Sequence, residues 1–206
     1  MRILPSGSTA MLVEVDDLDE VVALYAALVG DPPAGVVDIV PAARTLLLVT
    51  DPAVASLAAV ERAVRSTTPR EDQQARGELV EVPVTYDGED LEEAAALLGC
   101  DTVELVRRHT ADEWTVAFCG FIPGFGYLTS PTWTTAVPRR STPRTKVPLG
   151  AVALAGEFSG VYPRESPGGW QLLGRTPLTM FDPARQTPAV LRPGVRVRFV
   201  DEAAAP

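Results

Sequence analysis

Apolar and polar residues follow each other in patterns that predict a β-α-β-β-α order at the start of the chain. The patterns predict, in order, a strand at 8–15, a helix at 18–29 that Gly30 ends, strands at 36–40 and 45–50, and a helix from Asp51-Pro52 to about Arg65. Alternation with period two marks the strands, and apolar residues three and four apart mark the helices.

This order, continued by a strand at 79–86, resembles a ferredoxin-like α+β sandwich. Residues 67–78 (TTPREDQQARGE) are polar and contain Pro69 and Gly77, which is typical of an exposed connection. We therefore predict a domain boundary there, with an N-terminal α+β domain and its linker at 1–78 and a second domain at 79–206.

After its strand at 79–86, the second domain is predicted to contain two short helices and to continue as β-structure. Glu89-Asp90 starts the first helix, which runs to Leu98, and Thr102 opens the second, which runs towards His109. From residue 114 onward, short apolar runs lie between many Gly and Pro residues, a pattern typical of an all-β barrel or sandwich. These runs are 114–118, 151–155, 170–173 and 195–200.

The distribution of charge excludes some classes of partner. The formal net charge is −9, made up of −13 over residues 1–103 and +4 over residues 104–206. An acidic protein does not attract the polyanionic backbone of nucleic acids or an anionic membrane surface, so we expect neither as a partner. This asymmetry of charge predicts that the two halves of the chain contact different partners.

Cysteine usage and the N-terminus favour the cytoplasm. Cys100 and Cys119 lie apart without a histidine cluster, so we expect neither a metal site nor a disulfide framework. The first residues lack the apolar core of a signal peptide. Residues 114–138 carry no charge, but glycines and prolines interrupt them, and we expect a buried loop-and-strand region there rather than a membrane span.

A patch of positive charge is predicted within the second domain. Residues 114–156 contain no acid but include Arg139, Arg140, Arg144 and Lys146, and prolines at 138, 143 and 148 stiffen the segment. Arginine forks on a stiff loop are suited to holding a carboxylate or a phosphate. A solvated basic loop, or a docking surface for an acidic partner, is the alternative.

The glycine pair Gly168-Gly169 allows close backbone approach, and its N–H groups are candidates for an anion-binding nest. Glu165, just before the pair, is a candidate to orient an arginine or to act as a base. The alternative is a purely structural turn.

The aromatic residues near Pro123-Gly124 have two interpretations. We expect Phe121 to line the core as part of a packed turn, and Tyr127 to face a pocket, because a buried hydroxyl needs a hydrogen-bond partner. His109 is the only histidine. Either it caps the last carbonyls of its helix or it is a proton-transfer group.

Long ordered motifs carry a resemblance to a known family. They are GFIPGFGYL (120–128), PRRSTPRTKVPLG (138–150) and YPRESPGGWQLLGRTPL (162–178), with His109-Thr110 ahead of them. The chain resembles the KipI family, which includes the B-type subunit of 5-oxoprolinase and allophanate hydrolase subunit 1. The resemblance is strong over residues 82–200 and weaker over 1–66.

The resemblance implies a cyclophilin-like β-barrel and work beside other subunits. It implies a KipA-type (carboxyltransferase subunit 2) partner, possibly a LamB/YcsF-type subunit as well, and ATP-dependent opening of 5-oxoproline, a small anionic amide. The alternatives are a subunit linked to allophanate hydrolase or urea carboxylase, or an inhibitor of a sensor histidine kinase. Because the sequence contains no phosphate-loop motif, we expect any ATP site to be shared with partner subunits.

The candidate site residues follow from these motifs. The proton-transfer candidates are His109, Glu165 and Tyr127, and the candidates for binding the substrate or an anion are Arg139, Arg144, Lys146, Ser166, Gly168, Gly169, Gln171 and Arg175.

Three expectations follow for this set. The arginines of 114–156 find no acid within that segment, so we expect the chain to form a heteromer. We expect Arg144→Ala to remove activity with little loss of stability. We expect Gly169→Ala to slow turnover at least about a hundredfold if the glycine N–H groups line an anion site, and to cost only about 1 kcal/mol of stability if that glycine merely turns the chain with positive φ.

Overall fold

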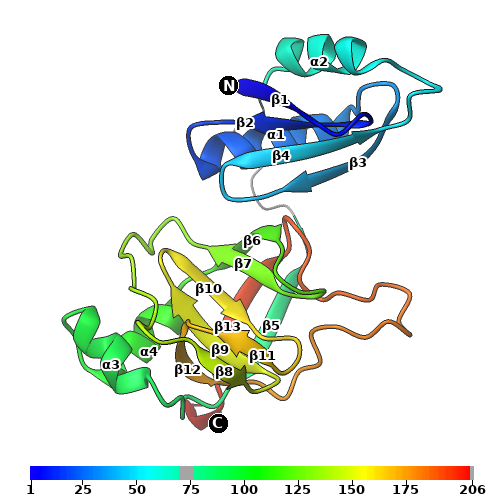
Figure 1. The fold of residues 1–206 in the computed structure, drawn as a ribbon. Coiled ribbons are helices and arrows are strands. Elements are labelled where there is room, and N and C mark those ends of the chain that lie inside the picture. Colours follow the sequence, from blue (N-terminus) through cyan, green and yellow to red (C-terminus); the bar gives the residue numbers. More distant parts are fainter. Residues whose placement is uncertain (70–76, 205–206) are drawn as a thin grey trace. The chain divides into compact units, whose positions relative to one another are not determined.

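The computed structural model describes residues 1–69 and 77–204, and the chain divides into two compact units (Figure 1). One unit spans Met1–Arg76 and the other Gly77–Pro206. We call them the N-terminal unit and the barrel unit. None of the described helices is long and apolar enough to cross a membrane.

The N-terminal unit is a four-stranded antiparallel sheet with two helices. Its elements are β1 (Arg2–Ser6), β2 (Ala10–Glu14), α1 (Leu18–Gly30), β3 (Val36–Pro41), β4 (Thr45–Thr50) and α2 (Leu57–Ser66), and the strand order is β1-β2-β4-β3. Val21 and Leu28 of α1 and Val60 of α2 are buried in one cluster with Leu46 and Leu48 of β4. Both helices therefore share one core with the sheet.

Two predictions for this unit are wrong. The strand predicted at 79–86 does not complete this sheet; its fourth strand is β1, and residues 79–84 pair with residues 196–201 of the barrel unit. The pattern missed β1 because this edge strand contains Pro5 and buries no residue fully. The second helix begins at Leu57, where Ser56 Oγ accepts from the Ala59 N–H, whereas Asp51 starts only a separate turn.

The barrel unit contains β5 to β13 and two helices. Its elements are β5 (Leu79–Val84), α3 (Leu91–Leu97), α4 (Thr102–Ala111), β6 (Trp114–Cys119), β7 (Gly126–Thr129), β8 (Arg144–Val147), β9 (Ala151–Ala155), β10 (Phe158–Val161), β11 (Ser166–Gly168), β12 (Gln171–Arg175), β13 (Arg196–Asp201) and a short 3-10 helix, Glu202–Ala204. The chain is thus a mixed α+β protein.

Seven of these strands form a nearly closed barrel. Their order is β12-β9-β10-β7-β6-β13-β5, and β5 runs parallel to β13. Just beyond β5, Thr85 and Arg175 exchange two backbone hydrogen bonds of 2.9 and 3.0 Å, which joins the two edges of the sheet. The remaining pair, β8 and β11, forms a separate two-stranded sheet.

Strand β9 shows why a continuous apolar run suits this barrel. All five of its residues are buried. Val152 and Leu154 belong to the core that includes Trp114 and Phe199, whereas its three alanines belong to a second core that includes Phe125. Because successive side chains point to opposite faces, a strand between two cores must be apolar throughout.

Candidate functional site

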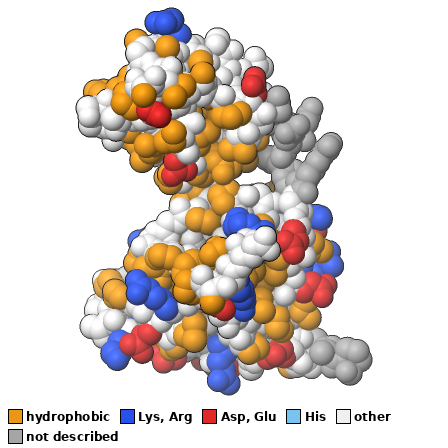
Figure 2. Space-filling view, turned by 90° about the vertical axis from the view of Figure 1, so that its right-hand side faces the viewer, with side chains coloured by type: hydrophobic (Ala, Val, Ile, Leu, Met, Phe, Trp, Pro, Cys, Tyr) orange, Lys and Arg blue, Asp and Glu red, His pale blue; other side chains and the backbone are white. Residues whose placement is uncertain are grey.

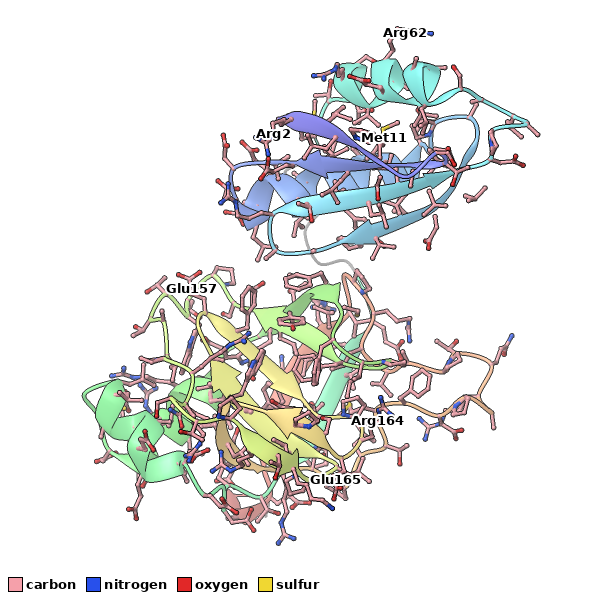
Figure 3. The ribbon with its side chains drawn as sticks, viewed as in Figure 1. Arg2, Met11, Arg62, Glu157, Arg164 and Glu165 are labelled. Atoms are coloured by element: carbon pink, nitrogen blue, oxygen red, sulfur yellow. The ribbon has the colours of Figure 1, made fainter. Side chains whose placement is uncertain are left out.

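The basic and glycine-rich motifs lie together in the barrel unit. We call residues 138–148 the basic loop and residues 165–170 the glycine-rich segment. Strand β8 pairs with β11, which places Arg144 opposite Gly168. The Arg140 N–H donates to the Gly169 carbonyl at 2.8 Å. The two motifs thus form one surface, with Glu165 on the connection between β10 and β11 (Figure 3).

A buried carboxylate, Asp90, holds the basic loop. Its side chain is 2 % exposed. Oδ1 accepts from Arg140 Nη1 at 2.5 Å and from Arg144 Nη2 at 2.7 Å, and Oδ2 accepts from the Leu172 N–H at 2.8 Å. Burial raises the pKa of Asp90. This effect is outweighed by the hydrogen bonds from Arg144 and Leu172 and by the two guanidinium charges, so the pKa of Asp90 lies below its usual value.

The sequence pattern missed this role. Asp90 stands just before α3, where a helix-capping side chain is expected, but it makes no capping hydrogen bond. Both oxygens of the carboxylate accept from other donors, two of them charged guanidinium groups, so the side chain turns away from the N–H groups of the helix. Asp90 therefore joins the candidate site as a residue that fixes two others.

Further ion pairs neutralise Arg140, Arg144 and Lys146 of the basic loop. Glu89 contacts Arg144 at 3.1 Å, Glu93 lies 3.8 Å from Arg140, and Glu165 contacts Lys146 at 3.0 Å. Figure 2 shows basic and acidic side chains side by side on one face of the barrel unit. Segment 114–156 contains no acid that could pair with these cations. In the structure their partners come from α3, from the two residues just before it and from Glu165.

Arg139 differs from its neighbours. It is exposed, and no ion pair or hydrogen bond joins its side chain to the parts of the chain that the structure describes. Its charge lowers the pKa of both Tyr127 and Tyr162, although burial raises each of them more. Arg139 is the basic-loop cation that remains available to a ligand.

Three atoms of this cluster keep unused hydrogen-bonding capacity. Arg140 Nε, Arg144 Nη1 and Gln171 Oε1 are buried and have no partner among the described residues. Gln171 is 1 % exposed, and its Nε2 donates to the Pro138 carbonyl at 3.2 Å. The cluster thus holds two donors and one acceptor that no described residue satisfies.

The two glycines of the glycine-rich segment have different surroundings. A Cβ at Gly168 would overlap the hydroxyl of Tyr162, a residue 2 % exposed, whereas a Cβ at Gly169 would lie 3.6 Å from the Cβ of Pro143. Neither has positive φ. Strain from positive φ therefore does not apply at Gly169, and close packing requires glycine only at 168.

We expect Gly168→Ala to lower the free energy of unfolding by about 1–3 kcal/mol, because overpacking against a buried tyrosine displaces it. We expect Gly169→Ala to change it by less than about 1 kcal/mol, since its methyl group makes ordinary contacts. Thermal unfolding of both variants checks this difference, and equal losses would contradict it.

One aromatic side chain of the GFIPGFGYL motif does not lie as expected. Phe121 is 55 % exposed, so the prediction that it lines the core is wrong. Phe125 is buried instead, with its ring 5.2 Å from that of Tyr162. Tyr127 is half-buried and stacks on Phe118 at 4.3 Å. Tyr127 thus belongs to an aromatic cluster that includes Phe125 and Trp170.

His109 lies inside the barrel, away from the basic loop. It is fully buried, its Nδ1 lies 2.7 Å from the Tyr86 hydroxyl, and its Nε2 lies 2.8 Å from Ser159 Oγ. Its ring stacks on Phe199 at 4.3 Å. The ring nitrogens do not cap the helix, and at this depth the side chain reaches neither solvent nor the other candidates.

Burial lowers the pKa of His109 to about 3, so we expect the ring to stay neutral throughout the physiological range. As the pH falls below 6.5, the unfolded chain takes up a proton that the folded chain refuses, and stability falls by up to about 1.4 kcal/mol per pH unit. Because His109 is the only histidine, its ring signals are directly assignable in an NMR titration. They should not shift between pH 8 and about 5. A midpoint near 6.5 would contradict the burial.

The family model for "Carboxyltransferase domain, subdomain C and D" matches residues 1–191. The chain belongs to this carboxyltransferase-domain family. The KipI-type resemblance drawn from the motifs is thereby confirmed, and the match extends across both units.

Individual relatives agree with the family. This carboxyltransferase-domain protein is 41 % identical over 171 residues to the B-type subunit of 5-oxoprolinase from Escherichia coli O157:H7, covering 81 % of this chain and 78 % of that protein. The solved structure of TTHA0988 has 38 % identity and a TM-score of 0.77 over 96 % of this chain. The present chain spans only 41 % of TTHA0988.

A more distant solved structure shares the fold alone. The urea amidolyase of Kluyveromyces lactis is 17 % identical, with a TM-score of 0.73 over 97 % of this chain and 14 % of that protein.

The structure brings most of the predicted site residues of this carboxyltransferase domain together, but not all. The basic loop and the glycine-rich segment unite Arg139, Arg144, Lys146, Glu165, Ser166, Gly168, Gly169 and Gln171. Arg175 lies at the far end of β12, where it pairs with Asp87 at 2.9 Å. Within the described ranges, no group of three or more His, Cys, Asp or Glu side chains is arranged to hold a metal ion.

Proposed function

We propose that this carboxyltransferase domain is a subunit of a bacterial ATP-dependent 5-oxoprolinase, which opens 5-oxo-L-proline to L-glutamate. The observation that carries the proposal is the 41 % identity to a protein named as a 5-oxoprolinase subunit, over most of both chains. The free guanidinium of Arg139, whose charge acts on Tyr127 and Tyr162, suits a small carboxylate that also carries ring methylene groups.

Each group of the cluster takes a part in this proposal. Arg139 pairs with the substrate carboxylate, while Asp90 fixes Arg140 and Arg144 at the base of the site. The amide groups of Gly168 and Gly169 are candidates to stabilise the oxyanion of the opening lactam. Glu165 and Tyr127 stay candidates for proton transfer, and the depth of His109 argues against it in that role.

The described residues do not fit ATP. A triphosphate needs several cations and backbone donors, but three of the four basic-loop cations are neutralised by carboxylates of this chain. We therefore place ATP at a site completed by other subunits.

The proposal also covers the partners of the chain, its location in the cell and the fold type of each unit. The partner is a KipA-type subunit, with a LamB/YcsF-type subunit as a further candidate, and the complex works in the cytoplasm. In fold, the N-terminal unit is of a ferredoxin-like kind whose edge strand is β1, and the barrel unit is of a cyclophilin-like kind. The near-closed seven-stranded order and the two-helix layer support these descriptions.

Co-expression with the products of neighbouring genes tests the function. The purified complex should hydrolyse ATP only when 5-oxoproline is present and should release glutamate. Turnover of allophanate instead would favour the subunit linked to urea metabolism, for which the present support is fold-level similarity. Binding to kinase dimerisation helices, without turnover, would favour the inhibitor alternative.

A further inference from the structure

Phe121 has a backbone conformation that phenylalanine seldom adopts. Its φ is +68°, and among the described residues it is the sole non-glycine with positive φ. The Ile122 N–H donates to the Gly120 carbonyl at 2.8 Å and closes a three-residue turn around it. Such turns are strained for residues with a Cβ, and strained residues cluster at functional sites.

Neither the turn nor the core explains why this residue is phenylalanine. Glycine or asparagine would adopt the same φ at lower cost. Its ring lies edge-on to the rings of Phe125 and Tyr162, with centroids 5.7 and 6.4 Å apart, and over half of the residue is exposed. The strain therefore keeps a large apolar ring in solvent instead of burying it.

The exposed ring and the free cation lie beside the same tyrosine. Phe121 lies edge-on to Tyr162, with ring centroids 6.4 Å apart. Arg139 directly precedes Arg140, whose N–H donates to the Gly169 carbonyl at 2.8 Å, and the charge of Arg139 lowers the pKa of Tyr162. Tyr162 in turn packs under Gly168 of the glycine-rich segment. An apolar face and a guanidinium thus border one small surface.

We propose that Phe121 is a specificity-determining residue whose ring packs against the ring carbons of a lactam carboxylate held by Arg139. This inference rests on the proposed function and adds to it the contact that selects ring size. A five-membered lactam carboxylate carries two ring methylene groups next to the carbon that bears its carboxylate, so a ring and a cation that both act on Tyr162 suit its two parts.

The test uses the complex with its partner subunits and compares Phe121→Gly, Phe121→Tyr and Val103→Ala. Val103 is a matched control, an apolar residue 77 % exposed on α4. We expect Phe121→Gly to raise the KM for 5-oxoproline roughly tenfold or more, with kcat changed less. It should also reduce discrimination against the lactam carboxylate with one more ring carbon.

Melting temperatures distinguish a substrate-binding role of Phe121 from a packing role. Glycine accepts positive φ without strain, so Phe121→Gly should melt at the same temperature as the wild type or higher. Phe121→Tyr keeps the ring and should keep the wild-type KM, as should Val103→Ala. A lower melting temperature with unchanged KM, or loss of the partner subunits from the complex, would overturn the proposal.

Calorimetric titration with 5-oxoproline keeps this test separate from that of the function. If the wild-type complex turns over 5-oxoproline and Phe121→Gly binds it equally well, the inference fails and the function stands. If there is no turnover but binding weakens in Phe121→Gly, the function fails and the inference stands. If the wild-type complex does not bind 5-oxoproline, both fail.

Discussion

Replacing Asp90 with alanine is expected to lower the free energy of unfolding by about 3 kcal/mol. The substitution leaves the Leu172 N–H without its acceptor and removes the charge that Arg140 and Arg144 share. Arg144 is 15 % exposed and Arg140 30 %, so water compensates them only in part. Chemical denaturation at neutral pH measures the difference.

Glu104 provides a matched control for Asp90. It also binds two arginines, Arg107 at 2.6 Å and Arg108 at 2.7 Å, but on the exposed surface of α4. We expect Glu104→Ala to cost less than about 1 kcal/mol, because water screens surface ion pairs. Equal losses for the two variants would show that Asp90 does not hold the basic loop.

The pairing with Asp90 also changes the expectation for Arg144. A clamp on a solvated loop could be removed without loss of stability, but this guanidinium is mostly buried and neutralises a buried carboxylate. Arg144→Ala should therefore reduce stability together with activity, which makes it a poor probe of substrate binding.

Arg139→Ala is expected to lower kcat/KM for 5-oxoproline about 10- to 150-fold. This range corresponds to the loss of one hydrogen bond between charged partners, about 1.5–3 kcal/mol. Since Arg139 is exposed and has no ion pair within the described chain, the melting temperature should stay unchanged. Steady-state kinetics and thermal unfolding of the same preparation check both statements.

Arg62→Ala is the matched control for Arg139→Ala. Arg62 is likewise an exposed arginine without an ion pair in the described residues, but it lies on α2 of the N-terminal unit (Figure 3). Its removal should leave kcat/KM unchanged. If Arg139→Ala behaves like Arg62→Ala, Arg139 does not bind the substrate.

Much of the fold follows from local pattern, and the errors have physical causes. The helical spacing of apolar residues before Gly30 predicted α1, because a helix buried on one face repeats apolar residues every three to four positions. The continuous apolar run predicted β9, which is buried on both faces. The edge strand β1 shows no clear apolar pattern, since its residues are exposed or half-buried. The short strand β11, which contains Pro167, was equally invisible.

The candidate site was predictable in its motifs but not in its electrostatics. The basic residues of 139–146 stood out, and so did the surplus of acids over 1–103. That these opposite charges pair within one chain depends on contacts more than fifty positions apart, such as Asp90 with Arg144. Local pattern therefore suggested a free basic loop, and only the fold identified Arg139 as its unpaired cation.

The most direct test of the proposed function is reconstitution with and without this chain. Partner subunits, ATP and 5-oxo-L-proline are combined, and released L-glutamate is measured. The proposal predicts glutamate release that requires the wild-type chain and falls strongly when Arg139→Ala replaces it. Glutamate release at the same rate without the chain, or none with it, would contradict the proposal.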